Sequence, residues 1–81
     1  MYAGDVTKPG SNAAKQVVDS RIVGKKPKNL SFSQAAAIPL VGLTAFEALH
    51  ENLSISLDKE KNKDKTILIV GGAGGVGSMA V

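Results

Sequence analysis

Residues 66–78 read TILIVGGAGGVGS, an apolar run that leads directly into a glycine-rich turn. The run at 66–70 is short, mostly β-branched and uncharged, which is typical of a strand buried on both faces of a parallel sheet. Apolar residues resume at Val76 and Met79 and predict a helix that begins at Gly75. The succession of strand, tight turn and helix predicts an α/β fold.

The glycines of this turn have the spacing of a dinucleotide-phosphate loop. Gly72, Gly74 and Gly77 fit the pattern GxGxxG. In that pattern the first glycine permits a tight turn, the second lets the backbone approach a pyrophosphate, and the third lets the next helix pack closely. Unpaired backbone N–H groups and the positive dipole end of the helix attract phosphate oxygens. The sequence therefore predicts a phosphate site, with a glycine-rich loop that binds nothing as the alternative.

The residues around the loop narrow this prediction. A P-loop requires a lysine directly after its second glycine, and Ser78 follows Gly77 instead. The acidic or basic residue that distinguishes the two nicotinamide dinucleotides would lie about 20 residues further on, beyond Val81. The sequence thus points to a dinucleotide and leaves its ribose phosphate open.

Two helices are predicted upstream of the loop, on either side of Pro39. Ser31 and Gln34 have the spacing of a capping box, which starts the first helix. Pro39 lacks an N–H group, so this helix should end or kink near Ile38. The second helix is amphipathic, with apolar residues at three- and four-residue spacings: Val41, Ala45, Ala48, Leu49 and Leu53. Residues 58–65 are charged without apolar anchors and predict a surface loop.

The amino-terminal third carries extended segments rather than helices. Residues 1–10 read as the end of a strand and a turn that contains Pro9 and Gly10. Residues 13–23 are rich in β-branched side chains and predict a second extended segment, interrupted by a turn near Asp19. Residues 24–29 should form a loop.

Composition excludes several classes of function. The 81 residues contain no cysteine, so neither a disulfide framework nor a thiolate metal site is available, and a cytoplasmic location is expected. The net charge of +3 is small, and no aromatic residues interleave with the lysine clusters, which argues against a nucleic-acid partner. No segment approaches the roughly 18 consecutive apolar residues that span a bilayer, so we expect no membrane partner.

Three segments together resemble a known family: YAGD at residues 2–5, AAAIPLVGLTAFEAL at 35–49 and GGAGGVGS at 71–78. Their order and spacing are similar to the medium-chain dehydrogenase/reductase superfamily, in particular its quinone oxidoreductase and zinc-type alcohol dehydrogenase-like branch. The resemblance implies that residues 1–41 are the carboxyl-terminal part of a GroES-like catalytic domain. Residues 42–81 would then be the truncated start of a Rossmann cofactor-binding domain, and the chain an internal piece of a larger enzyme.

The resemblance also implies an activity and a cofactor site. Hydride would pass from NADPH, rather than NADH, to a small-molecule quinone or activated alkene or carbonyl. Thr44 matches a threonine near the nicotinamide, although a helix-interior threonine bonded to its own backbone is an equal alternative. The remaining predicted cofactor-binding residues are those of the loop: Gly72, Gly74, Gly75, Val76, Gly77 and Ser78. His50, Glu47 and Glu51 are interpreted as surface residues, and no catalytic residue is identified.

One departure from the family pattern concerns zinc. Zinc alcohol dehydrogenases carry a catalytic cysteine four residues before the matched threonine, where this chain has Leu40. Only residues 6–11 stand where those enzymes have their four-cysteine zinc lobe. We therefore expect zinc-independent chemistry, with a zinc-dependent alcohol dehydrogenase or a non-catalytic nucleotide-binding fragment as alternatives. The edges of the run at 67–70 should seek partners, so a homo-oligomer is expected.

Overall fold

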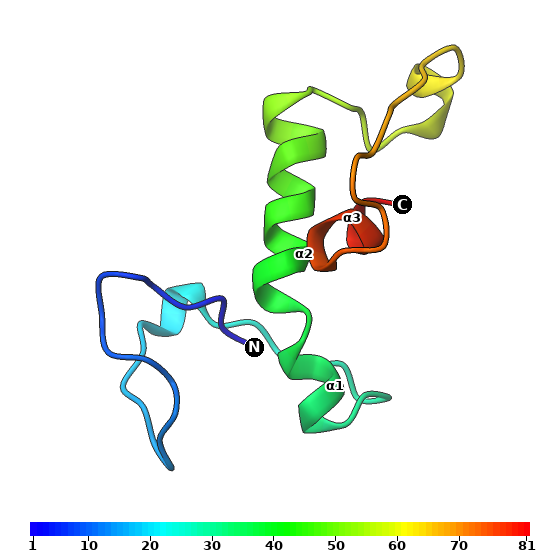
Figure 1. The fold of residues 1–81 in the computed structure, drawn as a ribbon. Coiled ribbons are helices and arrows are strands. Elements are labelled where there is room, and N and C mark those ends of the chain that lie inside the picture. Colours follow the sequence, from blue (N-terminus) through cyan, green and yellow to red (C-terminus); the bar gives the residue numbers. More distant parts are fainter. The chain divides into compact units, whose positions relative to one another are not determined.

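The computed structural model describes residues 1–81 and contains six short helical elements. The residues divide into two compact units, Met1–Leu40 and Val41–Val81. Figure 1 shows coiled segments joined by irregular chain, and no β-ladder is present. The helical half of the predicted α/β class is therefore observed, whereas its strands are not. The assignment of the units to GroES-like and Rossmann domains stays a prediction.

The first unit is mostly irregular and is tied together by local polar contacts. The backbones of Met1 and Gly24 exchange two hydrogen bonds, one of which runs from Gly24 N–H to the Met1 carbonyl at 2.8 Å. A 3₁₀ turn, η1 (Ser20–Ile22), follows Asp19, whose side chain accepts from the Arg21 N–H. The chain thus returns to its first residue just after the segment predicted at 13–23, and the Gln16 side chain donates to the Pro9 carbonyl at 3.5 Å, but the two predicted extended segments form no ladder. Residues 13–18 make no backbone pairing of their own beyond a local turn.

Helix α1 (Phe32–Ala36) begins as the sequence predicts. The Ser31 hydroxyl accepts from the Gln34 N–H at 3.1 Å, and the Ser31 N–H donates to the Gln34 side-chain oxygen at 2.9 Å. The helix ends at Ala36, and α2 (Pro39–Phe46) starts at the proline. The capping box and the break before Pro39 are both confirmed, because each depends only on neighbouring residues.

The loop before α1 is closed by Lys26. Its ammonium group donates to the carbonyls of Pro27, at 2.7 Å, and Leu30. The same ammonium lies 5.4 Å from the centre of the Phe32 ring, within reach of a cation–π interaction. Ala35, which lies three residues after Phe32 on α1, is only 2% exposed. The Lys26 side chain therefore holds the loop at 24–29 against the start of α1.

In the second unit, α2 runs into a π-helical stretch, η2 (Glu47–Asn52). The Leu53 N–H bonds to the Ala48 carbonyl at 3.0 Å, and the Ile55 N–H bonds to the Leu49 carbonyl at 2.8 Å. Ser54 reverses the chain with φ +54°, in the left-handed region. The predicted second helix is therefore confirmed to Asn52, and its last turns are wider than an α-helix.

The charged segment that follows is exposed, as predicted, and also contains a 3₁₀ turn, η3 (Lys59–Asn62). The Asn62 side chain organises it. Its oxygen accepts from the Ser56 N–H at 3.2 Å, and its nitrogen donates to the Ser56 carbonyl at 2.6 Å. One amide side chain thus pairs with both polar groups of a residue six positions earlier.

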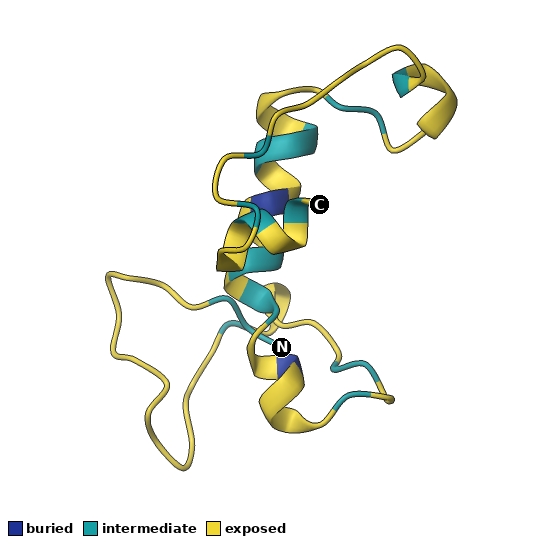
Figure 2. Cartoon of the chain, turned by 45° about the vertical axis from the view of Figure 1, so that its right-hand side comes forward, coloured by how far each residue is buried: buried dark blue, intermediate teal, exposed yellow.

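The prediction of a strand at residues 66–70 is wrong. The segment follows an uncoiled path between the charged loop and α3 (Gly75–Ala80), but its backbone bonds to no other segment. It is not buried on both faces either, since Leu68 and Val70 are 86% and 88% exposed. Figure 2 shows how little of the chain is buried. The two buried residues are Ala35 and Ala45, so no neighbouring layer covers the apolar run.

Candidate cofactor site

The glycine-rich turn joins the extended run to α3. Gly71 adopts φ +71°, a left-handed conformation that favours glycine. The Gly74 N–H returns to the Gly71 carbonyl at 2.8 Å, which closes the turn. Gly74 is then the extended residue that precedes α3, so the helix starts at Gly75 as predicted.

The structure shows why position 77 requires a glycine. A Cβ atom at Gly77 would lie 2.2 Å from the Gly71 carbonyl oxygen, and one at Gly74 would lie 3.2 Å from the same atom. The Gly71 carbonyl is therefore packed directly against the first turn of α3. We predicted the third glycine of the motif to serve packing between the helix and a sheet; here it serves packing between the helix and its own turn.

Three backbone N–H groups remain unpaired at this corner. The helix ladder begins with Ser78, whose N–H bonds to the Gly74 carbonyl at 2.9 Å. The N–H groups of Gly75, Val76 and Gly77 bond to no protein group. The Ser78 hydroxyl donates to the Gly75 carbonyl at 3.0 Å and so lies against the same turn. Adjacent free N–H groups are the arrangement that binds an anionic oxygen.

Helix α2 packs against the start of α3. A Cβ at Gly75 would lie 3.1 Å from a Val41 methyl carbon, and Figure 1 shows α3 beside α2. Ala45, one turn beyond Val41, is 4% exposed. Small residues on both helices thus permit their close approach. The contact between Val41 and Gly75 was not predicted from the sequence.

All seven predicted cofactor residues lie in the second unit. Six of them form the corner, and Thr44 is exposed on α2, three residues after Val41. The structure therefore places Thr44 on the helix against which the corner packs. The roles of these residues in cofactor binding stay predictions.

The His50 side chain has a structural task at the end of η2. Its Nδ1 atom lies 2.6 Å from the Ile55 carbonyl, and its ring centre lies 4.7 Å from that of Phe46. The imidazole thus helps to hold the reversal around Ser54. The exposed positions of Glu47 and Glu51 agree with their interpretation as surface residues.

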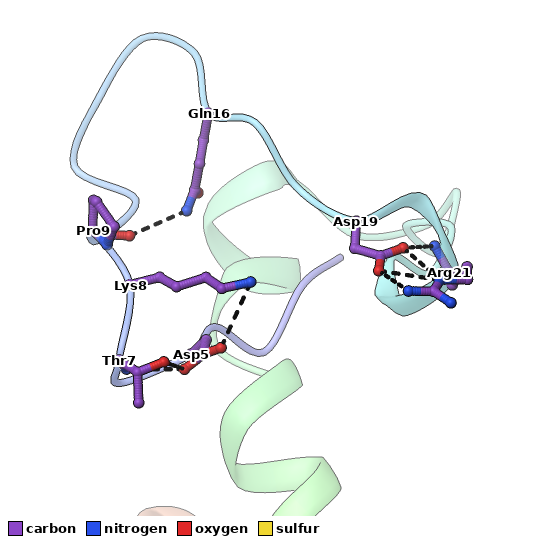
Figure 3. A network of polar contacts seen from close by, with 7 residues as sticks. All are labelled: Asp5, Thr7, Lys8, Pro9, Gln16, Asp19 and Arg21. Carbon is purple, nitrogen blue, oxygen red and sulfur yellow. Dashed lines mark hydrogen bonds and ion pairs between the residues drawn. The ribbon is translucent and has the colours of Figure 1, made fainter.

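The acidic side chains of the first unit are engaged in turns (Figure 3). The Thr7 hydroxyl donates to Asp5 at 2.6 Å, and this bond, with the Thr7 N–H, lowers the pKa of Asp5. The Arg21 guanidinium bonds to Asp19 at 2.6 Å, which lowers the pKa of Asp19 and raises that of Arg21. A lowered pKa suits a carboxylate that stays ionised rather than a general acid.

The structure offers no cluster of three or more His, Cys, Asp or Glu side chains for a metal ion. Leu40, at the position of the family's zinc-ligating cysteine, has an aliphatic side chain without a donor atom. No helix has both the length and the apolar character needed to cross a bilayer.

Comparison with known proteins finds relatives along nearly the whole chain. A zinc-type alcohol dehydrogenase-like protein of Staphylococcus aureus (strain COL) is 46% identical over 80 residues, which cover 99% of this chain and 24% of that protein. A mitochondrial reticulon-4-interacting protein 1 of Caenorhabditis elegans is 48% identical over 82 residues, covering 100% and 21%. A 2-methylene-furan-3-one reductase of Solanum lycopersicum is 47% identical over 72 residues, covering 89% and 17%.

The chain spans about a quarter of the length of the Staphylococcus relatives it matches. No protein-family model matches it, and no solved structure gives a significant match. Two of these three relatives carry the names of redox enzymes, an alcohol dehydrogenase-like protein and a reductase. Over almost its whole length, the chain is thus related to oxidoreductases of the medium-chain dehydrogenase/reductase superfamily.

Proposed function

We propose that the chain is the cofactor-binding part of an NADPH-dependent oxidoreductase that reduces a quinone or an activated alkene or carbonyl without zinc. The observation that carries this proposal is the glycine corner. There the backbone N–H groups of Gly75, Val76 and Gly77, in the first turn of α3, have no hydrogen-bond acceptor within the chain. The tomato relative, named for the reduction of a methylene-furanone, supports an activated alkene as the substrate class.

In this proposal the corner holds the pyrophosphate of the cofactor. The free N–H groups donate to phosphate oxygens, and the Gly71 carbonyl keeps the turn closed around the helix start. The Ser78 hydroxyl, now bonded to the Gly75 carbonyl, can still accept from a neighbouring group. Thr44 on α2 lies near the nicotinamide, which supplies the hydride when it is bound.

The side chains available here argue against a catalytic zinc ion, because the thiolate ligand is missing. Leu40 replaces the cysteine ligand, and the whole chain lacks cysteine. Polarisation of the substrate then depends on positioning and hydrogen bonds. Because several relatives are named zinc-type, a zinc-dependent alcohol dehydrogenase is the competing function. Stoichiometric zinc in metal analysis of the purified enzyme would decide for that alternative.

A fluorescence titration with NADPH and with NADH tests the cofactor site. Since the chain is much shorter than its relatives, the titration uses a protein that carries residues 1–81 in their natural context. Gly77→Ala should weaken NADPH binding at least tenfold, because its Cβ would meet the Gly71 carbonyl at 2.2 Å and displace the turn.

The matched control is Gly10→Ala, since a Cβ there meets nothing within 4 Å and its φ is not positive. The control should bind NADPH as tightly as the parent protein. Equal affinity in both variants would contradict the assignment of the corner. Tight NADPH binding without turnover of any quinone or enone would favour the non-catalytic nucleotide-binding alternative.

A further inference from the structure

Gly75 is a glycine that the loop pattern does not require. The pattern GxGxxG places its glycines at residues 72, 74 and 77 and leaves position 75 open. The backbone at Gly75 is helical and its φ is not positive, so its conformation suits any residue. Glycine is also a poorer helix former than alanine. A glycine at this position therefore needs a reason from its surroundings.

Val41 supplies that reason. Outside its own helix, a Cβ at Gly75 would meet a single atom within 4 Å, a γ-methyl carbon of Val41 at 3.1 Å. Val41 is half-buried on α2, and its two heavy atoms on Cβ hold the side chain in one preferred rotamer. The methyl group therefore occupies the space that a side chain at position 75 would need.

This contact lies between two parts of the proposed cofactor site. Gly75 carries the first of the three unpaired N–H groups at the glycine corner. Thr44 lies three residues after Val41, on the adjacent turn of α2. The contact between Val41 and Gly75 thus fixes how far the start of α3 stands from the helix that carries Thr44.

We propose that Val41 is a positioning residue for the cofactor. Its branched side chain sets the distance between α2 and the start of α3, and so aims the N–H groups of the corner at the phosphates. This inference rests on the proposed function and adds to it a residue that acts only through Gly75. Hydrogen bonds weaken steeply when donor and acceptor are misaligned, so a small displacement of α3 lowers the affinity for NADPH.

Single and double variants in NADPH fluorescence titrations test the proposal, in a protein that carries residues 1–81 in their natural context. Gly75→Ala should weaken NADPH binding about tenfold, although alanine is the better helix former, because its Cβ displaces α3 from Val41. Val41→Ala alone should weaken binding about threefold, because α3 loses its support. Together the two substitutions should bind within about threefold of the unaltered protein, since the lost methyl group leaves room for the added one.

Two controls show whether this rescue belongs to the contact. Val41→Thr keeps two heavy atoms on Cβ and should therefore not rescue Gly75→Ala. Val41→Ala should not rescue Gly77→Ala, because a Cβ at Gly77 would meet the Gly71 carbonyl instead. Melting temperatures of the unliganded variants separate positioning from stability. Rescue of the melting temperature without rescue of the NADPH affinity would show a merely structural contact and overturn the proposal.

The remaining outcomes separate this proposal from the assignment of the site. Failure of Val41→Ala to rescue Gly75→Ala would overturn the proposal and indicate that the added methyl group obstructs the phosphate directly. Rescue of Gly77→Ala as well would also overturn it. Unchanged NADPH affinity in Val41→Ala would do the same, and this result can be read even where Gly75→Ala does not fold. Absence of NADPH binding by the unaltered protein would instead contradict the proposed function, and this inference with it.

Discussion

Ser54 holds a backbone conformation that side chains disfavour. Its φ of +54° reverses the chain after η2, where glycine is the usual residue. The left-handed conformation costs a non-glycine residue roughly 1–2 kcal/mol, part of which glycine loses again through unfolded-state entropy. Ser54→Gly should therefore raise the free energy of unfolding by up to about 1 kcal/mol, measured by urea titration. Ser33→Gly, an exposed position within α1, should lower it by a similar amount.

The pair of Asp19 and Arg21 predicts a local pH dependence. Bonds from the Arg21 side chain and N–H lower the pKa of Asp19 in the folded chain. The stability that this pair contributes is present above the unfolded pKa of aspartate and is lost as the pH falls through the lowered folded pKa. An NMR titration of the Asp19 carboxyl carbon should show a midpoint below the ordinary value. Arg21→Gln should move the midpoint upward, and an unchanged midpoint would show that the contact does not persist in solution.

At the scale of elements, α1 depends on its amino-terminal cap. The helix has five residues, too few to be stable without help, and the Ser31–Gln34 box satisfies two of its free polar groups. Ser31→Ala should lower the free energy of unfolding by about 1 kcal/mol. Ser33→Ala, on the same helix and without a capping bond, is the control and should change it little. Equal effects of the two substitutions, in urea titrations followed by circular dichroism, would contradict the capping role.

The elements also show which predictions from the sequence succeed. The start of α1, the break before Pro39 and the start of α3 were predicted, because each is set by residues within one turn of it. The strand at 66–70 was not, since a strand requires hydrogen bonds from another segment and no such segment lies beside it. The glycine spacing located the candidate site, whereas the packing of the Gly71 carbonyl against Gly77 and the approach of Val41 to Gly75 depend on the three-dimensional structure.

At the scale of the whole molecule, the balance of buried and exposed apolar surface is unusual. Two alanines are buried, while seventeen large hydrophobic side chains are exposed, so each unit has little core of its own. Local bonds such as the Lys26 contacts and the Asn62 pairing therefore carry much of the order within the units. Exposed apolar faces of this extent are suited to pack against further protein.

The pairing of Asn62 with Ser56 has a chemical consequence for ageing of the protein. A carboxamide can both donate and accept, so it imitates a short piece of neighbouring main chain. Slow hydrolysis of that amide would give a carboxylate, which keeps the acceptor and loses the donor. The Ser56 and Asp58 carbonyls would then face a negative charge in place of the nitrogen that now donates to them, and the contacts that organise η3 would weaken.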